Sequence, residues 1–419
     1  MSSVIGFVKR NYTVLNPPTV AKSGDVLRFG ILGAANIAPM GIIVPAKTHP
    51  EVIVAAVAAR DRKKAEAYAK KHQIPIVHDN YDNLINDPSL DCIYNPLPNG
   101  LHYEWTIKAL KAGKHVLLEK PSVSNATEAK SLFRHPLLSQ PNAPVLLEAF
   151  HYRFHPAWQH FLTLFEKEDI EHVEVVNKLF AGMFPLKDIR FDYSLSGGAL
   201  MDFGTYAIST VRQIIGSEPV AVTSARVRLV PEPYDQRAES AAYASYEFPN
   251  GATADITADL YAKGGYWLPA LTKNWPDFNG ALPTLTVKLK GKTNGLNTSG
   301  KVITFHNYMG PWLYHRIDIA TVTETKDQQG KVVKSDKKVE YKKVYKWETT
   351  EEGKKGEDYW ATYRYQLEEF VNRVKGRKGS GVWVDPEDSI RQMEMVDATY
   401  EKAKRPLRPT SAALDTSGP

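Results

Sequence analysis

The chain has 419 residues, of which 43% are hydrophobic and 24% are charged, and its formal net charge is +6. This composition excludes a chain that is disordered or collagen-like over its whole length. No apolar run reaches the roughly 18 residues of a membrane span, so we expect no membrane partner. The one cysteine, Cys92, rules out an intrachain disulfide, and residues 1–9 lack a secretory pattern, so we expect a cytoplasmic protein.

Residues 1–24 are interpreted as an extended polar arm, because Pro17 and Pro18 disfavour a helix. From residue 27 to residue 149, short apolar runs of strand length alternate with helical patterns. The runs are apolar throughout, as in strands that helices cover on both faces of a sheet. The alternation predicts an α/β domain over residues 25–150, with a doubly wound parallel sheet of the Rossmann type. The expected strands are residues 27–32, 52–59, 74–77, 92–95, 115–118 and 145–148.

After Phe150 the pattern changes, because strand-like runs follow one another without helices between most of them. Turn residues such as Asn250 and Gly251 separate several runs. This pattern predicts an α+β domain over residues 151–404, with a large, mostly antiparallel sheet that is open on one face. The expected strands are residues 173–180, 221–230, 241–248, 252–261, 285–289 and 302–306, and the expected helices are residues 206–215, 359–374 and a last one that begins at Asp385.

The end of the chain contains a charged stretch and a proline-rich segment. Lysines at residues 326–355 are interleaved with acidic residues, so this stretch is interpreted as a solvated hairpin and not as a nucleic-acid surface. Since no other stretch concentrates positive charge, we expect no nucleic-acid partner. Residues 405–419 are interpreted as a loose tail.

Small residues follow the first expected strand where a dinucleotide-binding turn needs them. Gly33 allows the tight turn, Ala35 stands where a second glycine brings the pyrophosphate close, and Ala38 packs the next helix on the strand. After the second strand, Arg60 stands where an acidic residue would read the ribose of NAD, and its guanidinium suits a 2′-phosphate. The pattern favours NADP as the cofactor, with Asp61 as the competing signal for NAD.

Lys120 lies within a Glu-Lys-Pro sequence at the end of an expected strand, at the sheet edge where ligands bind. A glycine pair precedes Asp202 and Tyr206, which share a helical face if the helix has begun there. The tyrosine hydroxyl, with a pKa of about 10, is a poor base at neutral pH. A neighbouring lysine cation would lower that pKa, so Lys120 and Tyr206 together predict a catalytic pair.

Residues 30–38, 119–121 and 198–206 occur in the order and spacing of a known family, and over about residues 27–400 the chain resembles the Gfo/Idh/MocA oxidoreductases. Residues 95–102 and 148–156 resemble further segments of that family. Tyr206, where other members have histidine, resembles glucose–fructose oxidoreductases, NADP-dependent D-xylose dehydrogenases and dimeric dihydrodiol dehydrogenases.

The resemblance implies that Tyr206 takes the C1 hydroxyl proton of a cyclic aldose, that Lys120 binds the same hydroxyl, and that Asp202 orients the sugar or Lys120. It implies an NADP cofactor and no metal. The expected cofactor contacts are Gly33, Ala34, Ala35, Asn36, Ile37, Arg60, Asn95, Leu97, Asn99, His102, Glu119, Lys120 and Glu148.

Arg153, His155 and Arg190 are candidate substrate contacts, and for each an interdomain ion pair or a hydrogen bond in the core is an equal alternative. The expected activity is oxidation of an aldose to its lactone, and a tightly held NADP would make it a two-sugar cycle. The arm at residues 1–24 would then cover the cofactor and slow its release.

Three further expectations follow from the resemblance. One alternative activity is that of a trans-dihydrodiol dehydrogenase, which uses the same lysine and tyrosine. Another alternative is a non-catalytic, NADP-binding regulator similar to the yeast galactose-regulon repressor. The resemblance also implies a homodimer.

Overall fold

The first sheet is parallel throughout, as the sequence predicts. The computed structural model describes residues 4–266, 269–278, 282–329, 331–347 and 353–414. Its first sheet contains β1 (Leu27–Leu32), β2 (Val52–Ala58), β3 (Ile76–His78), β4 (Cys92–Asn95), β5 (His115–Leu118) and β6 (Leu146–Glu148). The strand order is β3-β2-β1-β4-β5-β6, with every neighbouring pair parallel. This is the doubly wound order of dinucleotide-binding domains, whose ligands bind at the carboxyl ends of the strands.

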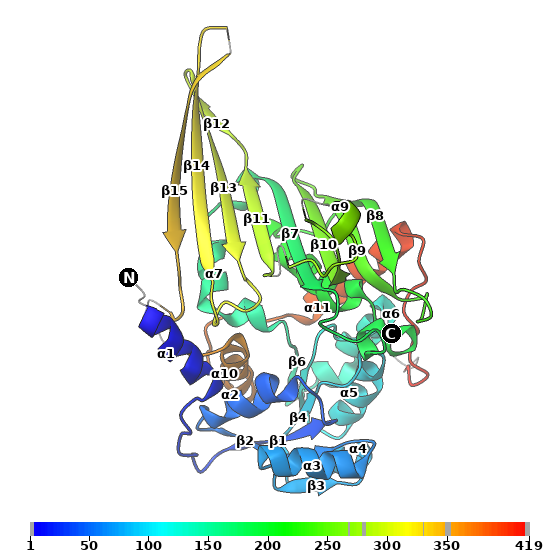
Figure 1. The fold of residues 1–419 in the computed structure, drawn as a ribbon. Helices are drawn as coiled ribbons and strands as arrows, with labels where there is room; N and C mark the ends of the chain where they lie inside the picture. Colours follow the sequence, from blue (N-terminus) through cyan, green and yellow to red (C-terminus); the bar gives the residue numbers. More distant parts are fainter. Residues whose placement is uncertain (1–3, 267–268, 279–281, 330, 348–352, 415–419) are drawn as a thin grey trace.

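Helices follow the strands of the first sheet in turn. They are α2 (Val44–Lys47), which continues a π-helical segment at Pro39–Ile43, and α3 (Arg62–His72), α4 (Tyr81–Ile85), α5 (His102–Lys111) and α6 (Ala126–Phe133). Figure 1 shows α2 and α3 on opposite sides of β1 and β2. Asn125 begins α6 as its cap, because its side-chain oxygen accepts a hydrogen bond from the backbone N–H of Glu128 at 3.1 Å.

The second sheet is mixed and mostly antiparallel. Within the described residues it contains nine strands, in the order β15-β14-β13-β11-β7-β10-β9-β8, with the short β12 beside β13. Only β7 and β10 pair in parallel; all other neighbours are antiparallel. The strands are β7 (Ile170–Phe180), β8 (Ala221–Leu229), β9 (Glu239–Glu247), β10 (Thr253–Ala262), β11 (Thr284–Leu289), β12 (Lys292–Asn294), β13 (Asn297–His306), β14 (Arg316–Lys326) and β15 (Val332–Lys342).

One face of this sheet carries helices. In β7, Val173 and Val175 are fully buried, whereas Glu174 between them is exposed. This alternation places the core on one side of the sheet. The helices that complete the fold are α7 (Pro156–Leu162), α8 (Thr205–Ile215), α9 (Pro269–Thr272), α10 (Thr362–Val374) and α11 (Pro386–Lys402), of which α8 and α11 contact this sheet. None of the helices in the described part of the chain is long and apolar enough to span a membrane.

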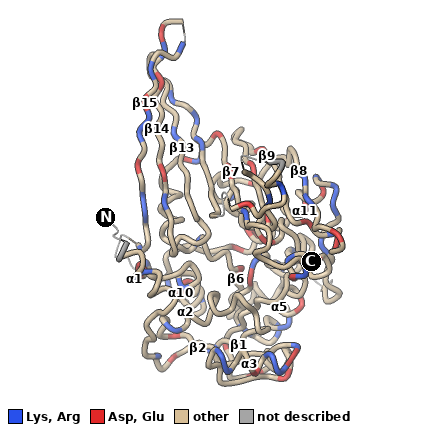
Figure 2. The backbone as a smooth tube through the Cα atoms, viewed as in Figure 1, with Lys and Arg blue, Asp and Glu red and all other residues tan. Residues whose placement is uncertain are grey.

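The charged stretch at residues 326–355 supplies one strand of an antiparallel hairpin, β15, whose partner β14 precedes the stretch, and residues 330 and 348–352 of the stretch lie outside the described residues. Figure 2 shows basic and acidic residues along this hairpin. Lys334 and Lys338 form ion pairs with Asp336 and Glu340 on β15. Nearly every residue of β15 is exposed, which explains why no apolar alternation marks it in the sequence.

The extended arm predicted for residues 1–24 is wrong for its first half, because Val4–Leu15 forms the helix α1. Pro17 and Pro18 follow the end of this helix, where prolines commonly stand. The guanidinium of Arg10 lies 3.6 Å from the ring centroid of Tyr345 and donates to the carbonyl oxygen of Trp312 at 3.3 Å. The arm is therefore a docked helix.

The loose tail predicted for residues 405–419 is also wrong over its described part. Arg408 is 2% exposed and forms an ion pair with the fully buried Glu239. The backbone N–H of Ser411 donates to Glu128 at 2.6 Å. A buried guanidinium needs such a carboxylate partner, and this pair holds the segment against the protein. Residues 415–419 lie outside the described residues.

Helix α10 packs against the first sheet and its helices, although more than 200 residues separate it from that sheet in the sequence. The rings of Phe370 and Phe29 on β1 lie 5.8 Å apart. Arg364 donates to the hydroxyl of Thr48 at 2.9 Å, just after α2. A segment near the C-terminal end of the chain thus completes the core of the first sheet.

Candidate active site

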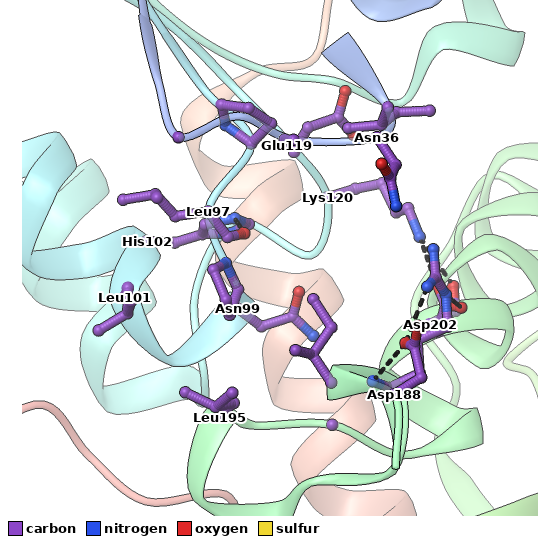
Figure 3. A pocket seen from close by; sticks show the side chains of 18 of the residues that line it. Asn36, Leu97, Asn99, Leu101, His102, Glu119, Lys120, Asp188, Leu195 and Asp202 are labelled. Carbon is purple, nitrogen blue, oxygen red and sulfur yellow. Dashed lines mark hydrogen bonds and ion pairs between the residues drawn. The ribbon is translucent and has the colours of Figure 1, made fainter. Parts of the chain in front are cut away.

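A cavity of about 720 Å³ lies where the carboxyl ends of the first sheet's strands face the second half of the chain. Its walls come from the loops after β1, β2, β4 and β5 and from segments around α8, α10 and residues 309–313. Figure 3 shows side chains from these loops pointing toward one another across the space. The lining includes Gly33, Ala34, Ala35, Asn36, Ile37, Arg60, Asp61, Lys64, Leu97, Asn99, His102, Glu119, Lys120, His151, Asp188, Arg190, Asp202, Tyr206, Met309, Trp312, Leu313 and Tyr363.

The loop after β1 forms a cradle that fits a dinucleotide. Gly33 has a φ of +88°, which favours glycine, and a Cβ there would lie 3.2 Å from Cδ2 of Leu97. Residues 34–37 continue the wall, and the carbonyl oxygen of Ala35 accepts a hydrogen bond from Tyr68 at 3.0 Å. The turn is therefore tight and held in place, as a pyrophosphate-binding turn has to be.

Basic side chains surround the end of β2. Arg60 and Lys64 line the cavity and are exposed to solvent. Asp61 also lines it, but its carboxylate accepts a hydrogen bond from the N–H of Lys64 at 3.2 Å and so caps α3. The carboxylate of Asp61 is hydrogen-bonded to the backbone of α3, whereas the cationic side chains of Arg60 and Lys64 line the cavity. This arrangement fits a 2′-phosphate better than a bare ribose.

His102 contacts the loops after β4 and β5, which both line the cavity. Its Nε2 lies 2.6 Å from the carbonyl oxygen of Leu97, after β4, and its Nδ1 lies 2.8 Å from that of Pro121, after β5. Burial lowers the pKa of His102 to about 4, and the two carbonyl oxygens, which favour the protonated ring, only partly oppose this. Asn99 donates to the carbonyl oxygen of Ser196 at 3.0 Å and ties the same loop to the second half of the chain.

A chain of alternating charges crosses the cavity. Lys120 Nζ lies 2.7 Å from Oδ1 of Asp202, and Arg190 donates to Oδ2 of Asp202 at 3.0 Å and to Asp188 at 2.9 Å (Figure 3). Burial opposes ionisation of Asp202, but Lys120 and Arg190 outweigh it and lower the pKa of this carboxyl. Asp202 is therefore an ionised acceptor for a polar ligand.

Tyr206 lies beneath Lys120, whose ammonium is 4.5 Å from the centroid of the phenol ring. The expectation that Lys120 lowers the pKa of Tyr206 is wrong in this structure. Burial raises the pKa of Tyr206 well above its usual value, and the ammonium hydrogen-bonds to Asp202. The hydroxyl of Tyr206 lies 2.8 Å from Nε2 of His151, whose Nδ1 lies 2.7 Å from the hydroxyl of Thr362.

Glu119 lines the cavity next to Lys120 and is buried. Its carboxyl accepts a hydrogen bond from the hydroxyl of Tyr94 at 2.6 Å. Burial raises the pKa of Glu119, and this hydrogen bond and Lys120 only partly oppose the effect. Tyr94 thus fixes the side chain that precedes the catalytic lysine candidate.

Two expected cofactor contacts do not line the cavity. Asn95 is fully buried and donates to the hydroxyl of Thr106 at 3.0 Å, so it fastens β4 to α5. Glu148 is 1% exposed and accepts a hydrogen bond from the N–H of Ser122 at 2.8 Å. Each side chain is held by hydrogen bonds within the first half of the chain and away from the cavity lining, so the two cofactor contacts stay predictions.

Two of the candidate substrate contacts, Arg153 and His155, also lie outside the cavity lining. Arg153 is 2% exposed, forms an ion pair with Asp388 and donates to the hydroxyl of Ser209. His155 is fully buried, and its Nδ1 accepts a hydrogen bond from the N–H of Ala157 at the start of α7. Both match the alternative of a core or ion-pair role, whereas Arg190 lies at the cavity.

Several residues at the cavity were not predicted. His151, Trp312 and Tyr363 meet there from separate parts of the chain, with the rings of His151 and Tyr363 4.0 Å apart. No local motif marks Trp312 or Tyr363, and His151 carried a signal only through its place in the 148–156 segment. Within the described residues, no group of three or more His, Cys, Asp or Glu side chains is placed to hold a metal ion.

Comparison with protein families gives two matches along the chain. Residues 27–136 match the model described as "Oxidoreductase family, NAD-binding Rossmann fold" (GFO_IDH_MocA). Residues 161–280 match the GFO/IDH/MocA C-terminal domain. The first match covers β1 to β5 of the first sheet, and the second match covers β7 to β10 of the second sheet.

Comparison with individual proteins includes a match over nearly the whole chain. D-xylose 1-dehydrogenase (NADP(+)) 2 of Haloferax volcanii is 30% identical over 396 residues, which are 93% of this chain and 99% of that enzyme. Trans-1,2-dihydrobenzene-1,2-diol dehydrogenase of Xenopus laevis is 32% identical over 182 residues, 43% of this chain and 53% of that enzyme. The structure of aldose-aldose oxidoreductase from Caulobacter crescentus, with glycerol, matches at a TM-score of 0.66 and 19% identity over 90% of this chain and 98% of that one, a likeness of fold alone.

Proposed function

Because the chain belongs to the GFO/IDH/MocA oxidoreductase family, we propose that it is an NADP-dependent sugar oxidoreductase that oxidises C1 of an aldose to the lactone. The observation that carries the proposal is the meeting of Lys120, Asp202 and Tyr206 at one cavity, beside the cradle at Gly33. The full-length likeness to a D-xylose 1-dehydrogenase supports an aldose as the substrate class.

The residues at the cofactor end support NADP. Arg60 and Lys64 would bind the 2′-phosphate, residues 34–37 the pyrophosphate, and Leu97 and Asn99 the nicotinamide half. When bound, the oxidised cofactor supplies the acceptor for the hydride that leaves C1. The chain itself has to bind the sugar and accept the hydroxyl proton.

Lys120, Asp202 and Tyr206 each have a role in binding the sugar or in accepting its proton. Lys120 donates a hydrogen bond to the C1 oxygen and stabilises negative charge on it. Asp202, held ionised by Lys120 and Arg190, accepts hydrogen bonds from sugar hydroxyls and orients the ring. Tyr206 takes the C1 hydroxyl proton as the general base.

The test is turnover of the purified protein with D-glucose, D-xylose and D-galactose, each with and without added NADP⁺. Steady NADPH formation with added NADP⁺ is the expected result, and Tyr206→Phe and Lys120→Ala should each lose most of it while still binding NADP. Reduction of co-purified cofactor alone would indicate a two-sugar cycle. A Tyr206→Phe variant with unchanged turnover would contradict the mechanism.

The second candidate activity is that of a trans-dihydrodiol dehydrogenase. The cavity lining includes the apolar side chains of Phe184, Phe203, Met309 and Trp312, and apolar side chains suit a cyclohexadiene ring. Benzene dihydrodiol belongs in the same panel. Oxidation of the diol without oxidation of any sugar would select this activity, and bound cofactor without any reduction would favour a regulatory protein.

We further propose a homodimer formed through the open face of the second sheet. Arg226 is exposed and Tyr243 is half-buried on the neighbouring strands β8 and β9, and the guanidinium carbon of Arg226 lies 3.7 Å from the ring centroid of Tyr243. Light scattering with size exclusion should give twice the mass of the chain. A mass equal to one chain at micromolar concentration would contradict the dimer.

A further inference from the structure

The hydroxyl of Tyr206 lies 2.8 Å from Nε2 of His151, and the hydroxyl of Tyr363 is its second polar neighbour. His151 is 3% exposed, and its ring also contacts the rings of Tyr363 and Trp312. The imidazole is therefore held in one orientation, with one nitrogen aimed at the phenol oxygen and the other at Thr362.

A base at Tyr206 needs a partner of this kind. The phenol is 4% exposed, and burial disfavours its ionised form. A phenolate oxygen can only accept hydrogen bonds, so neighbouring N–H or O–H donors have to stabilise it, and Nε2 of His151 and the hydroxyl of Tyr363 are in place to do so. Lys120 lies over the ring face and donates to Asp202 instead. The charged or titratable groups that face Tyr206 are Lys120, Asp202, Glu119, His151, Tyr152, Tyr308 and Tyr363.

We propose that His151 is a positioning residue that stays neutral and donates its Nε2 hydrogen to the phenol oxygen of Tyr206, so that the ionised form of Tyr206 is stabilised. This inference rests on the proposed function, because it assigns the group that makes Tyr206 a base. The neutral state follows from the surroundings: burial and, to a smaller extent, the nearby Lys120 lower the pKa of His151 to about 3.

Thr362 provides the partner that the proposed tautomer needs. In a neutral ring with hydrogen on Nε2, Nδ1 is a bare acceptor, and the Thr362 hydroxyl, 2.7 Å away, is able to donate to it. Thr362 is fully buried at the first turn of α10, so its hydroxyl cannot hydrogen-bond to bulk water. The relay runs from Thr362 through His151 to Tyr206, and each member donates to the next.

The first experiment is the pH profile of sugar oxidation. The rise of kcat with pH reports ionisation of Tyr206, and His151→Leu, which removes the donor, should move this rise up by about one to two pH units. His151→Gln keeps an N–H donor and should restore most of the shift. A His151→Leu profile that is lower but not displaced would overturn the proposal, because a packing defect alone lowers kcat at every pH.

Thr362 offers a matched pair of variants. Thr362→Val removes the hydroxyl and keeps the shape, so the profile should move in the same direction as in His151→Leu. Thr362→Ser keeps the hydroxyl and should leave the profile in place. Equal profiles for the two variants would overturn the assigned role of Thr362 and with it the tautomer.

The second experiment needs no turnover. Nitrogen NMR of the ¹⁵N-histidine-labelled protein at neutral pH should show a neutral ring with hydrogen on Nε2, in a signal that is absent from His151→Gln. A signal for hydrogen on Nδ1, or for a doubly protonated ring, would overturn the inference. Failure of the wild-type protein to oxidise any sugar would contradict the proposed function, and the NMR result would still decide this one.

Discussion

Arg60 and Asp61 are neighbours at the end of β2, and the structure gives them different tasks. Asp61 caps α3, and Arg60 faces the cavity. We therefore expect Arg60→Ser to weaken NADP binding about ten- to hundredfold, because a charge-assisted pair with the 2′-phosphate is lost. Binding of NAD should hardly change. Titration of both cofactors by protein fluorescence measures this.

Arg62 provides the control for Arg60. It is equally exposed two residues later, does not line the cavity and pairs with Glu66 on α3. Arg62→Ser should therefore leave the NADP affinity unchanged. Equal affinities for NADP in the wild-type protein and in Arg60→Ser would show that the cation does not read the 2′-phosphate.

Glu148 makes stability depend on pH. Burial raises its pKa from 4.5 to about 7, and the hydrogen bond from Ser122 and the charge of Arg153 only partly oppose this. A raised carboxyl pKa contributes stability that is complete below pH 4.5 and is lost as the pH rises through 7. Between pH 5 and pH 8, Glu148→Gln should therefore lose less unfolding free energy than the wild type, by on the order of 2 kcal/mol.

Denaturant unfolding at the two pH values measures the effect of Glu148→Gln. The exposed Glu247, at the end of β9, serves as the control, and Glu247→Gln should follow the wild-type pH dependence. Identical losses in the wild type and Glu148→Gln would contradict the raised pKa. The glutamine can still accept the hydrogen bond from Ser122, so the comparison isolates the ionisation.

At the scale of elements, α1 fastens the loop that closes one side of the cavity. Arg10 donates to the carbonyl oxygens of Trp312 and Leu313, and both of these residues line the cavity. Val14 packs with Trp312 and Tyr363. We expect Arg10→Ala to raise the dissociation rate of NADP about fivefold, since the loop loses these hydrogen bonds.

Stopped-flow displacement of NADP measures this rate. Lys9→Ala, one residue earlier on the exposed side of α1, should leave the rate as it is. Removal of residues 2–22 tests the same idea less sharply, because it also removes Lys22, whose ammonium binds the carbonyl oxygens of Ala46 and His49. An unchanged rate in both Arg10→Ala and the truncated chain would remove α1 from cofactor retention.

The elements also show what the sequence could and could not predict. The strands of the first sheet were predictable because burial on both faces leaves a continuous apolar run. β15 was not, since a strand that is exposed on both faces carries no such signal. α1 was missed because Pro17 and Pro18 were given weight over the twelve residues before them, where they only mark the end of the helix.

At the scale of the whole molecule, local sequence motifs predicted four residues that lie at the cavity. Gly33, Lys120, Asp202 and Tyr206 lie at the cavity because a turn, a strand end and a helix start place them there. Trp312, Tyr363 and His151 could not be placed in this way, because the contacts that bring them together join parts of the chain 50 to 210 residues apart. Asn95, Glu148, Arg153 and His155 do not line the cavity, and the sequence could not show this, since a polar residue near a motif gives no sign of the direction of its side chain.

The position of α10 and of Arg408 has a consequence for biosynthesis. Thr362 and Tyr363 begin the helix that covers the first sheet, and Arg408 donates at 2.6 Å to the carbonyl oxygen of Gly197, in the cavity wall. A nascent chain on the ribosome has therefore displayed every strand of both sheets before the residues that finish the pocket emerge. Cofactor binding is then expected late in synthesis. A chain that ends before Arg408 lacks the hydrogen bond to Gly197 in the cavity wall, and we expect proteases to degrade it more readily.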